Sequence, residues 1–594
     1  MTESSDRAVQ ASGARLDVGL GIAAAMLLGV AALSFSGTIV DDAYISFRYA
    51  RHLAMGDGLV FNPGEAVEGY TNFSWTLLMA AALRLGFRAE SAATVVGWGA
   101  IFLTLFVIWR LGGRLFLSRR RKLLALFALS AAPSLSYWAT AGLETPLYTL
   151  LSAIALWSLL HAWRGGSGLP AALVLLALPM TRPDGVLLVA PAIVVWWFAA
   201  PSRRQWLVGV SVVVVGGAFY AGWKLVAFGS LLPNTFFAKV LLSGQSVALG
   251  ATYLAAFLRL YPWAVLGLVA SVWILLSHRV SKLRETEKGA PEDDDPGGGA
   301  GRQHGVGAWG AAGKDPGVAL LWLIVAQSVL VLLFALAVGG DIFPYLRFLT
   351  PLLPGLALAA VSLPWSERRL GWLMVVAVLI GAFQIKVGKD AWRALAMTRM
   401  VRMGELVGRY LDRRLPKHAV IAVNAAGALP YYARRITVDM LGLTDAHIAR
   451  NPVSVEDALA FRGHAHHDGA YVLRRRPSVI IWGNTVGRED PLYPSDHALA
   501  QRPAFRRDYR LLRIPLSQIA RALDGAKEDN RPKTELLGTL IGVKTEEADP
   551  RVVRSMGLFE RRVPAGLLTL CELWRYDPDV LLWIHRDVTL RPIR

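Results

Sequence analysis

The chain has 594 residues, of which 54% are hydrophobic and only 18% are charged, against about 25% charged in an ordinary soluble protein. Long apolar blocks before residue 390, which thin out after it, exclude a wholly soluble enzyme and indicate a membrane part followed by a soluble part. The net charge of +19 does not indicate nucleic-acid binding here, because many of the cations lie in short loops between apolar blocks. The single cysteine, Cys571, excludes an internal disulfide and a cysteine-based metal site.

The apolar blocks predict about eleven membrane spans. The first block, 18–40, is long enough to cross about 30 Å of hydrocarbon and lacks the small-residue cleavage site of a signal peptide. The short block 73–85 is predicted to lie in the interface, because only then do the basic loops share one side. The other spans are predicted at 92–109, 123–139, 145–162, 169–181, 185–200, 206–227, 249–276, 318–338, 346–363 and 371–387.

The basic loops orient these spans. Clusters at 110–122, 203–204, 279–284 and 368–369, together with Arg164, fall on one side, which the positive-inside rule makes cytoplasmic. The N-terminus is then predicted to be cytoplasmic, and everything after residue 390 is predicted to lie outside.

The predicted domains follow from this topology. Residues 1–390 form a transmembrane domain whose first outer loop is 41–91. Its connection 284–317, acidic and then Gly-rich without a phosphate-loop lysine, is predicted to be a disordered cytoplasmic linker. Residues 391–594 are expected to form an α/β extracytoplasmic domain, with a helix at 391–413 and strands at 419–423 and 478–482.

Polar residues at the span ends gather on the predicted outer side. A charge at the centre of a membrane helix costs about 2.5–3.5 kcal/mol, so a set drawn from six loops onto one face indicates a shared polar cavity. The set comprises Asp41, Asp42, Tyr44, Arg48, Arg51, Glu65, Glu68, Tyr70 and Asn72 in the first loop, then Glu144, Arg182, Asp184, Asn234, Lys239, Asp341, Tyr345 and Arg347.

Asp41 and Asp42 open a predicted helical segment, 42–54, on which Asp41, Tyr44, Arg48 and Arg51 share one face. One interpretation is a carboxylate base for an acceptor hydroxyl, with cations for phosphate. The other is a helix cap followed by a salt-bridged interfacial face.

The later loops carry the same ambiguity. Arg182 and Arg347 suit bidentate contact with phosphate, or anchor helices at the interface. Asp184 and Asp341 can equally be turn or N-cap residues.

The predicted outer domain offers two weaker motifs. His464, His466, His467 and Asp468 can ligate a metal, but flanking glycines and the lack of a helical His-x3-His favour a solvated loop. The stretch 424–427 follows a predicted strand but lacks G-x-G-x-x-G, so dinucleotide binding is not expected.

Several of these stretches together resemble the GT-C superfamily of integral-membrane glycosyltransferases. They are VDDAYISFRYARH (40–52), GLVFNPGE (58–65), VEGYTN (67–72), GLETP (142–146), TRPDG (181–185), LPNTFFAK (232–239) and GGDIFPYLR (339–347). Within the superfamily the closest likeness is to the mycobacterial terminal β-(1→2)-arabinofuranosyltransferase group. AAGALPYY (425–432) and DMLGLTD (439–445) resemble the same group, which extends the likeness over nearly the whole chain.

The resemblance implies a helical GT-C membrane fold and inverting transfer of a sugar, expected to be arabinofuranose. The donor is a polyprenyl-phosphate sugar, and the acceptor is a cell-envelope glycan outside the membrane, for which the outer domain is the expected binding platform. In the family the acidic pair supplies the base, which carries over to Asp41 first and Asp42 second, while Arg347, Arg182 and Lys239 are candidates to hold the leaving phosphate. The implied donor- and acceptor-binding set is Tyr44, Arg48, Glu68, Tyr70, Asn72, Glu144, Arg182, Asp184, Asn234, Lys239, Asp341, Tyr345 and Arg347.

Asp41 and Asp42 can also hold a divalent cation through their oxygens, although a donor with one phosphate does not require it. Two other classes stay open. A lipid-linked sugar flippase or transporter needs polar groups reachable from both faces, whereas here the acids crowd to one side. A non-catalytic scaffold would tolerate replacement of Asp41.

Overall fold

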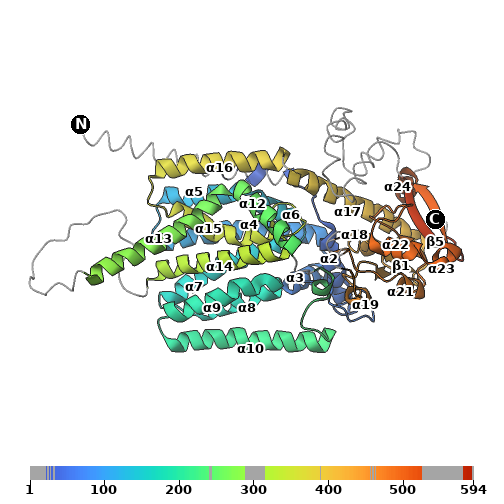
Figure 1. The fold of residues 1–594 in the computed structure, drawn as a ribbon, viewed down its shortest axis with the longest axis horizontal. Coiled ribbons are helices and arrows are strands. Elements are labelled where there is room, and N and C mark those ends of the chain that lie inside the picture. The colour runs from blue at the N-terminus through green and yellow to red at the C-terminus, as the bar shows by residue number, and fades with distance from the viewer. Residues whose placement is uncertain are drawn as a thin grey trace, which may run out of the picture.

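A computed structural model describes residues 34–239, 244–287, 315–387, 389–454, 463–524 and 579–590, with a few positions before 34 and between 454 and 463. Long helices form one half of the molecule, and a sheet with short helices forms the other (Figure 1). The predicted span 18–40 and the linker 284–317 lie largely outside the described residues.

The helical half contains α2 to α16. In chain order its elements are α2 (Asp41–Met55), α3 (Phe73–Arg84), α4 (Ala89–Arg114), α5 (Arg119–Ser130), α6 (Pro133–Thr140), α7 (Thr145–Trp163), α8 (Leu169–Thr181), η1 (Pro183–Gly185), α9 (Val186–Ala199), α10 (Arg203–Phe228), α11 (Asn234–Lys239), α12 (Gly244–Leu260), α13 (Pro262–Glu287), α14 (Pro316–Val338), η3 (Arg347–Leu352), α15 (Leu353–Val361) and α16 (Glu367–Val387).

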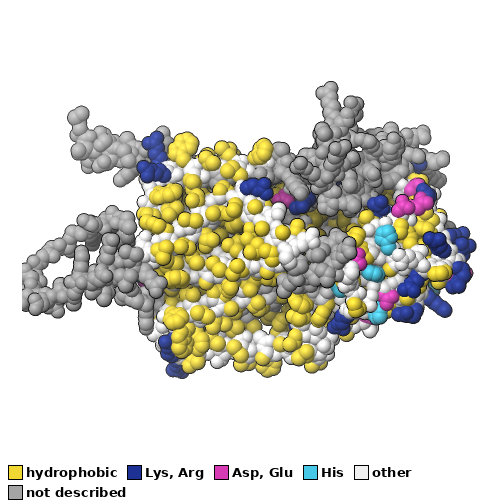
Figure 2. Space-filling view, viewed as in Figure 1, with side chains coloured by type: hydrophobic (Ala, Val, Ile, Leu, Met, Phe, Trp, Pro, Cys, Tyr) yellow, Lys and Arg dark blue, Asp and Glu magenta, His cyan; other side chains and the backbone are white. Residues whose placement is uncertain are grey.

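Four described helices, α4, α7, α10 and α14, are long and apolar enough to cross a membrane, and two bent helix pairs would raise the number to six. Hydrophobic side chains cover the visible face of the helical half, with basic side chains at its outer edge (Figure 2). The chain is therefore a mostly helical membrane protein. The count of eleven spans stays a prediction.

Three predicted spans are divided in the structure. The stretch 123–139 forms α5 and α6, which meet at 56°, and 249–276 forms α12 and α13, which meet at 96°. Pro133 and Pro262 begin the second helix of each pair, because proline lacks the N–H that would continue the first. The stretch 346–363 starts as η3, which contains Pro351, before α15.

Three of the basic segments that we predict to share one side, namely 110–122, Arg164 and 368–369, lie close together. Arg121 donates from Nη1 to the carbonyls of Val361 and Leu363 at 2.7 and 2.8 Å. Arg164 reaches the carbonyl of Arg114 at 2.8 Å. These contacts bring the three segments to one end of the bundle, and the side of the membrane on which this end lies stays a prediction.

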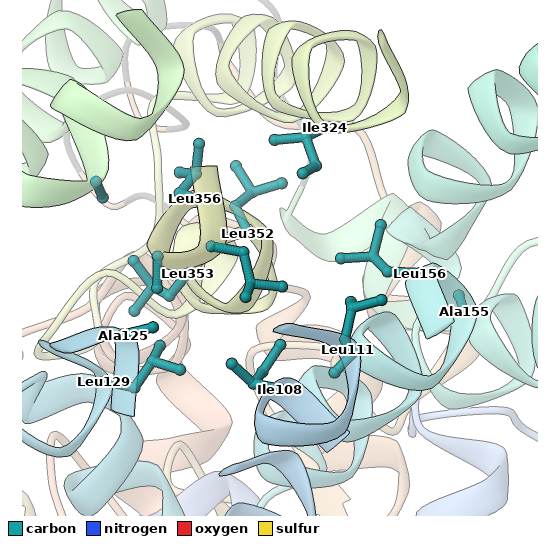
Figure 3. Close-up of a cluster of buried hydrophobic side chains, with 14 of the residues drawn as sticks. Ile108, Leu111, Ala125, Leu129, Ala155, Leu156, Ile324, Leu352, Leu353 and Leu356 are labelled. Atoms are coloured by element: carbon teal, nitrogen blue, oxygen red, sulfur yellow. The ribbon is translucent and has the colours of Figure 1, made fainter. Parts of the chain in front are cut away.

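The core of the bundle forms around η3 and α15. Figure 3 shows Leu352, Leu353 and Leu356 surrounded by side chains from α4, α5, α7 and α14. Every residue of α15 is buried, which explains why this segment is apolar on all sides rather than on one stripe.

The second half begins with α17 (Lys389–Arg414) and continues in a five-stranded sheet of order β2-β1-β3-β5-β4. The first three strands are parallel, and β5 pairs antiparallel with β3 and β4. The predicted helix 391–413 and the predicted strands 419–423 and 478–482 are confirmed as α17, β1 and β3. The remaining elements are β1 (Val420–Val423), α18 (Ala428–Ala433), β2 (Ile436–Asp439), α19 (Ala446–Arg450), α21 (Gly469–Arg474), β3 (Val479–Ile481), α22 (Pro494–Ala500), α23 (Pro503–Asp508), β4 (Tyr509–Pro515), α24 (Leu516–Asp524) and β5 (Asp579–His585).

Candidate active site

Asp41 and Asp42 are the first residues of α2, at the end of the bundle that faces the sheet half (Figure 1). The carboxylate of Asp41 accepts hydrogen bonds from the backbone N–H groups of Ala428 and Gly427 at 2.8 and 3.2 Å. Burial raises the pKa of Asp41 to about 7, the neighbouring charge of Asp42 adds to this rise, and the two amides oppose it. Asp41 is thus a fixed carboxylate whose pKa is close to neutral pH.

Asp42 points to a different partner. Its Oδ2 lies 3.3 Å from Nζ of Lys239 on α11, and its side chain is 32% exposed. Burial would raise the pKa of Asp42, but the charges of Lys239 and Arg347, and then of His464, bring it below its usual value. Three of the predicted site residues, Asp42, Lys239 and Arg347, therefore come together from elements far apart in the sequence.

Arg347 is held by an unusual piece of backbone. Tyr345 and Leu346 have positive φ angles of 59° and 56°, a conformation that costs non-glycine residues about 1–3 kcal/mol each. The guanidinium of Arg347 lies 3.8 Å from Asp341 and 4.6 Å from the ring centroid of Phe343. Strain at this turn is characteristic of functional sites, where the surrounding structure fixes the direction of a side chain.

The neighbours of this turn are buried. Burial raises the pKa of Asp341 to about 6, against the opposing charges of Arg347 and Arg182. The ring of Tyr345 packs between Phe35 and Tyr137. Its hydroxyl has no hydrogen-bond partner among the described residues, and neither has the buried hydroxyl of Tyr70.

The shared helix face of α2 contacts protein rather than an open cavity. Tyr44 packs against Tyr431 and Tyr432 of α18, with ring centroids 5.3 and 5.6 Å apart. Arg51 donates to the carbonyl of Tyr431 at 2.8 Å.

Arg48 is the most constrained member of this face. It is 2% exposed, and its guanidinium donates to the carbonyls of Phe61, Pro430 and Arg435 at 2.8, 2.8 and 2.7 Å. Further bonds to Asn62 and Thr437 complete its contacts. All five N–H donors of the guanidinium have protein acceptors, so this placement does not fit the predicted contact of Arg48 with substrate. The sequence did not indicate the carbonyl partners Pro430 and Arg435, because they lie almost 400 residues away in the chain.

A second buried network contains four predicted site residues. Arg182 donates to Glu144 at 2.9 Å and to Asp184 at 2.9 and 3.1 Å. The amide of Asn72 donates to Glu144 at 2.8 Å. Glu144, Arg182 and Asn72 are each no more than 6% exposed, and their polar atoms pair with one another. Their geometry indicates that these residues hold the loops around the site in position through buried contacts with one another.

Glu68 and Asn234 hold the first outer loop to later segments. Glu68 pairs with Lys224 of α10 at 2.9 Å, and its carbonyl accepts from the N–H of Asn234 at 2.8 Å. The side-chain amide of Asn234 donates to the carbonyl of Gly442 at 2.7 Å. Sequence reasoning missed Lys224, although a lysine inside the apolar block 206–227 was the available signal.

The described residues contain no group of three or more His, Cys, Asp or Glu side chains that could hold a metal ion. Asp41 and Asp42 point to different partners, so the structure offers no converging ligand set from this pair. In the histidine-rich loop, His466 and His467 bond to backbone carbonyls and His464 stacks on Tyr493, which fits the predicted loop better than a metal site.

Comparison with known proteins agrees with the resemblance to the arabinofuranosyltransferase group. A curated relative from Mycobacterium tuberculosis, named terminal β-(1→2)-arabinofuranosyltransferase, is 28% identical over 386 residues, which are 60% of this chain and 58% of the relative. One of the same name from Corynebacterium glutamicum is 26% identical over 377 residues, 58% of this chain and 50% of the relative. The chain thus spans about half the length of these relatives, and the likeness is narrower than the nearly complete coverage that we predict.

One further comparison matches part of the sequence, and two others concern the similarity of the backbone to solved structures. A family described as a domain of unknown function, DUF8728, matches residues 392–531. Crystal structures of ArnT from Cupriavidus metallidurans are also similar. The apo form has a TM-score of 0.47 at 15% identity, covering 77% of this chain and 92% of ArnT. The form bound to undecaprenyl phosphate has a TM-score of 0.46 at 14% identity, covering 70% and 85%.

Proposed function

We propose that this protein is an inverting membrane glycosyltransferase of the GT-C type. It moves arabinofuranose from a polyprenyl-phosphate donor to a cell-envelope glycan on the outer side of a bacterial plasma membrane. The observation that carries the proposal is the carboxylate pair Asp41 and Asp42, held at one end of an apolar helix bundle beside the cations Lys239 and Arg347. The names of the two curated relatives support the sugar.

In the proposed reaction Asp41 acts as the general base. Its carboxylate takes the proton of the acceptor hydroxyl while the hydroxyl oxygen attacks the anomeric carbon of the donor. The bond from that carbon to the phosphate oxygen breaks, and the polyprenyl phosphate leaves with the electron pair. A single displacement inverts the anomeric configuration and forms no sugar–enzyme bond. The two backbone amides that hold Asp41 fix the base in place before the acceptor arrives.

Lys239 and Arg347 suit the other half of the reaction. The leaving phosphate gains negative charge in the transition state, and cations placed in advance stabilise that charge without reorganisation. In the free protein Asp42 neutralises Lys239, so this ammonium is kept in position before the donor enters. The proposal assigns the leaving-group role to these two residues rather than to Arg182, whose guanidinium bonds to Glu144 and Asp184.

The test is transfer from a synthetic polyprenyl-phosphoryl arabinofuranose to an arabinofuranoside acceptor by the purified protein. We expect product with the native chain and a loss of at least about 100-fold, the usual contribution of a general base, with Asp41→Asn. Asp57→Asn is the matched control, because Asp57 is an exposed acid just beyond the end of α2.

The outcomes separate the alternatives. Full activity of Asp41→Asn would remove the base assignment. Absence of transfer with every lipid-linked sugar, together with movement of such a lipid between leaflets of a vesicle, would replace the proposal by a flippase.

A further inference from the structure

The surface of the sheet half carries a shallow, open hollow, lined by Ala446, His447, Arg450, Asn451 and Pro452. It is formed by α19 and the two residues that follow this helix. No role predicted from the sequence falls on these five residues.

A flat ring forms one wall of this hollow. The imidazole of His447 stacks on the ring of Tyr471, with centroids 4.2 Å apart and planes 19° from parallel. Nε2 of His447 lies 2.9 Å from Oδ2 of Asp468, yet the side chain is 46% exposed. The ring is therefore fixed from behind and presents an open face to solvent.

Of the other lining residues, Arg450 and Asn451 are polar, and Ala446 and Pro452 are apolar. Tyr471, which stacks on His447, connects the hollow to the first outer loop. The hydroxyl of Tyr471 bonds to Asp445 and to Arg475 at 3.0 and 2.9 Å, and Arg475 continues to Glu65 at 2.6 Å. The fixed imidazole of His447 can stack on the apolar C–H face of a sugar. The guanidinium of Arg450 and the side chain of Asn451, whose Nδ2 also donates to the carbonyl of His467, can bond to its hydroxyl groups. A phosphate would need more cations than the single Arg450 of the lining.

The hollow contacts α11, the helix whose last residue belongs to the proposed reaction centre. The guanidinium of Arg450 is 5.3 Å from the ring centroid of Phe237, which belongs to α11. Lys239, the last residue of α11, pairs with Asp42. Phe237 and Lys239 are two residues apart, which is about 200° around the helix, so their side chains leave opposite sides of α11.

We propose that this hollow is a subsite for the acceptor glycan, holding neutral sugar units of the chain whose terminal hydroxyl reaches Asp41. The inference rests on the proposed function, and it names where the acceptor binds. His447 supplies the stacking face, and Arg450 and Asn451 supply hydrogen bonds. Long acceptors occupy the hollow, whereas a single sugar at the reaction centre does not reach it.

The experiment compares His447→Ala and Arg450→Ala with the native full-length protein. Transfer is measured with an arabinofuranose hexasaccharide and with methyl arabinofuranoside, and hexasaccharide binding is measured by calorimetry without donor. We expect each variant to raise KM for the hexasaccharide roughly tenfold, the effect of one or two lost contacts, with kcat and the KM for the monosaccharide unchanged. His447→Phe, which keeps a flat ring, should retain most of the binding.

Arg506→Ala is the matched control, because Arg506 is exposed on α23, which precedes the strand at the opposite edge of the sheet from β2. Unchanged hexasaccharide binding and KM in both alanine variants would overturn the subsite. If the native protein transfers to neither acceptor but binds the hexasaccharide through His447 and Arg450, the proposed function fails while the glycan site stands.

Discussion

The adjacent residues Asp41 and Asp42, at the start of α2, lie in environments that shift the pKa values of their carboxyl groups in opposite directions. Asp41 lies against backbone amides, and burial brings its pKa to about 7, whereas Asp42 faces Lys239 and Arg347, and its pKa is lowered. Such a split suits a proton acceptor next to a permanent negative charge. It arises because consecutive helical residues point about 100° apart, so each meets a different segment of the chain.

The rate of transfer should depend on pH through Asp41. Only the ionised carboxylate can accept a proton, so activity falls as pH drops through about 7. Asp42→Asn should move this limb to lower pH, because the charge of Asp42 raises the pKa of Asp41. The measurement is the pH profile of kcat/KM for both proteins, with Asp57→Asn as the unshifted reference. Coincident profiles would show that Asp41 is not the titrating group.

Removal of divalent cations is expected to leave transfer unchanged, since Lys239 and Arg347 provide positive charge beside the carboxylates. The measurement is the initial rate after exhaustive treatment with EDTA, with and without added Mg²⁺ or Mn²⁺. A rate that disappears with EDTA and returns with one metal would restore the predicted cation at Asp41 and Asp42.

The buried network around Glu144 should matter for stability. Glu144→Ala leaves Arg182 and Asn72 without one of their acceptors in a buried place, and breaking a buried pair costs about 3–5 kcal/mol. Glu489→Ala removes an acid that pairs with Arg513 at the surface, where the cost is below about 1 kcal/mol. Thermal unfolding of both variants in detergent checks the difference, and equal midpoints would contradict it.

One element that joins the two halves is α18, which docks on α2. Gly427 lies at the start of this contact, and a Cβ there would be 2.1 Å from the carbonyl oxygen of Asp41 and 2.4 Å from its carboxylate. The backbone of Asp41 cannot move far enough to relieve such an overlap, so only glycine at position 427 permits α18 to approach α2 this closely. The contact is therefore specified by one small residue that the sequence motif 425–432 contains.

Gly427→Ala is expected to separate α18 from α2 and to abolish transfer, while the helix bundle stays folded. Gly371→Ala is the control, since a Cβ at Gly371 meets nothing within 4 Å. The transfer rate and the helical circular dichroism signal are measured together. Native activity in Gly427→Ala would show that the amide contacts to Asp41 are dispensable.

At the scale of the whole molecule, the sequence predicted the location of charged and apolar segments better than the course of individual helices. Basic loops at one end and acids at the other were readable, because insertion orients charges strongly. The proline-divided spans were not, since hydropathy does not report a bend. The partners of Arg48 on the α2 face were not predictable from the sequence either, because the carbonyls of Pro430 and Arg435 lie far away in the chain.

The orientation of the whole chain is testable with single cysteines placed in a Cys571→Ser background. Arg502→Cys, on the sheet half, should react with a membrane-impermeant maleimide in intact cells, whereas Arg369→Cys, at the basic end of the bundle, should react only after lysis. Both positions are exposed in the structure. The reverse labelling pattern would invert the proposed topology.

The hydrogen bonds to Asp41 come from residues 386 and 387 positions later in the chain. At a synthesis rate of about 5–20 residues per second, roughly 20–80 s separate the appearance of the carboxylate from that of its amide partners. The carboxylate therefore gains these two partners only after residues 427 and 428 have been synthesised. If Asp41 is the base of the proposed reaction, translation order itself delays transfer until the segment after α17 has been made and has packed on α2.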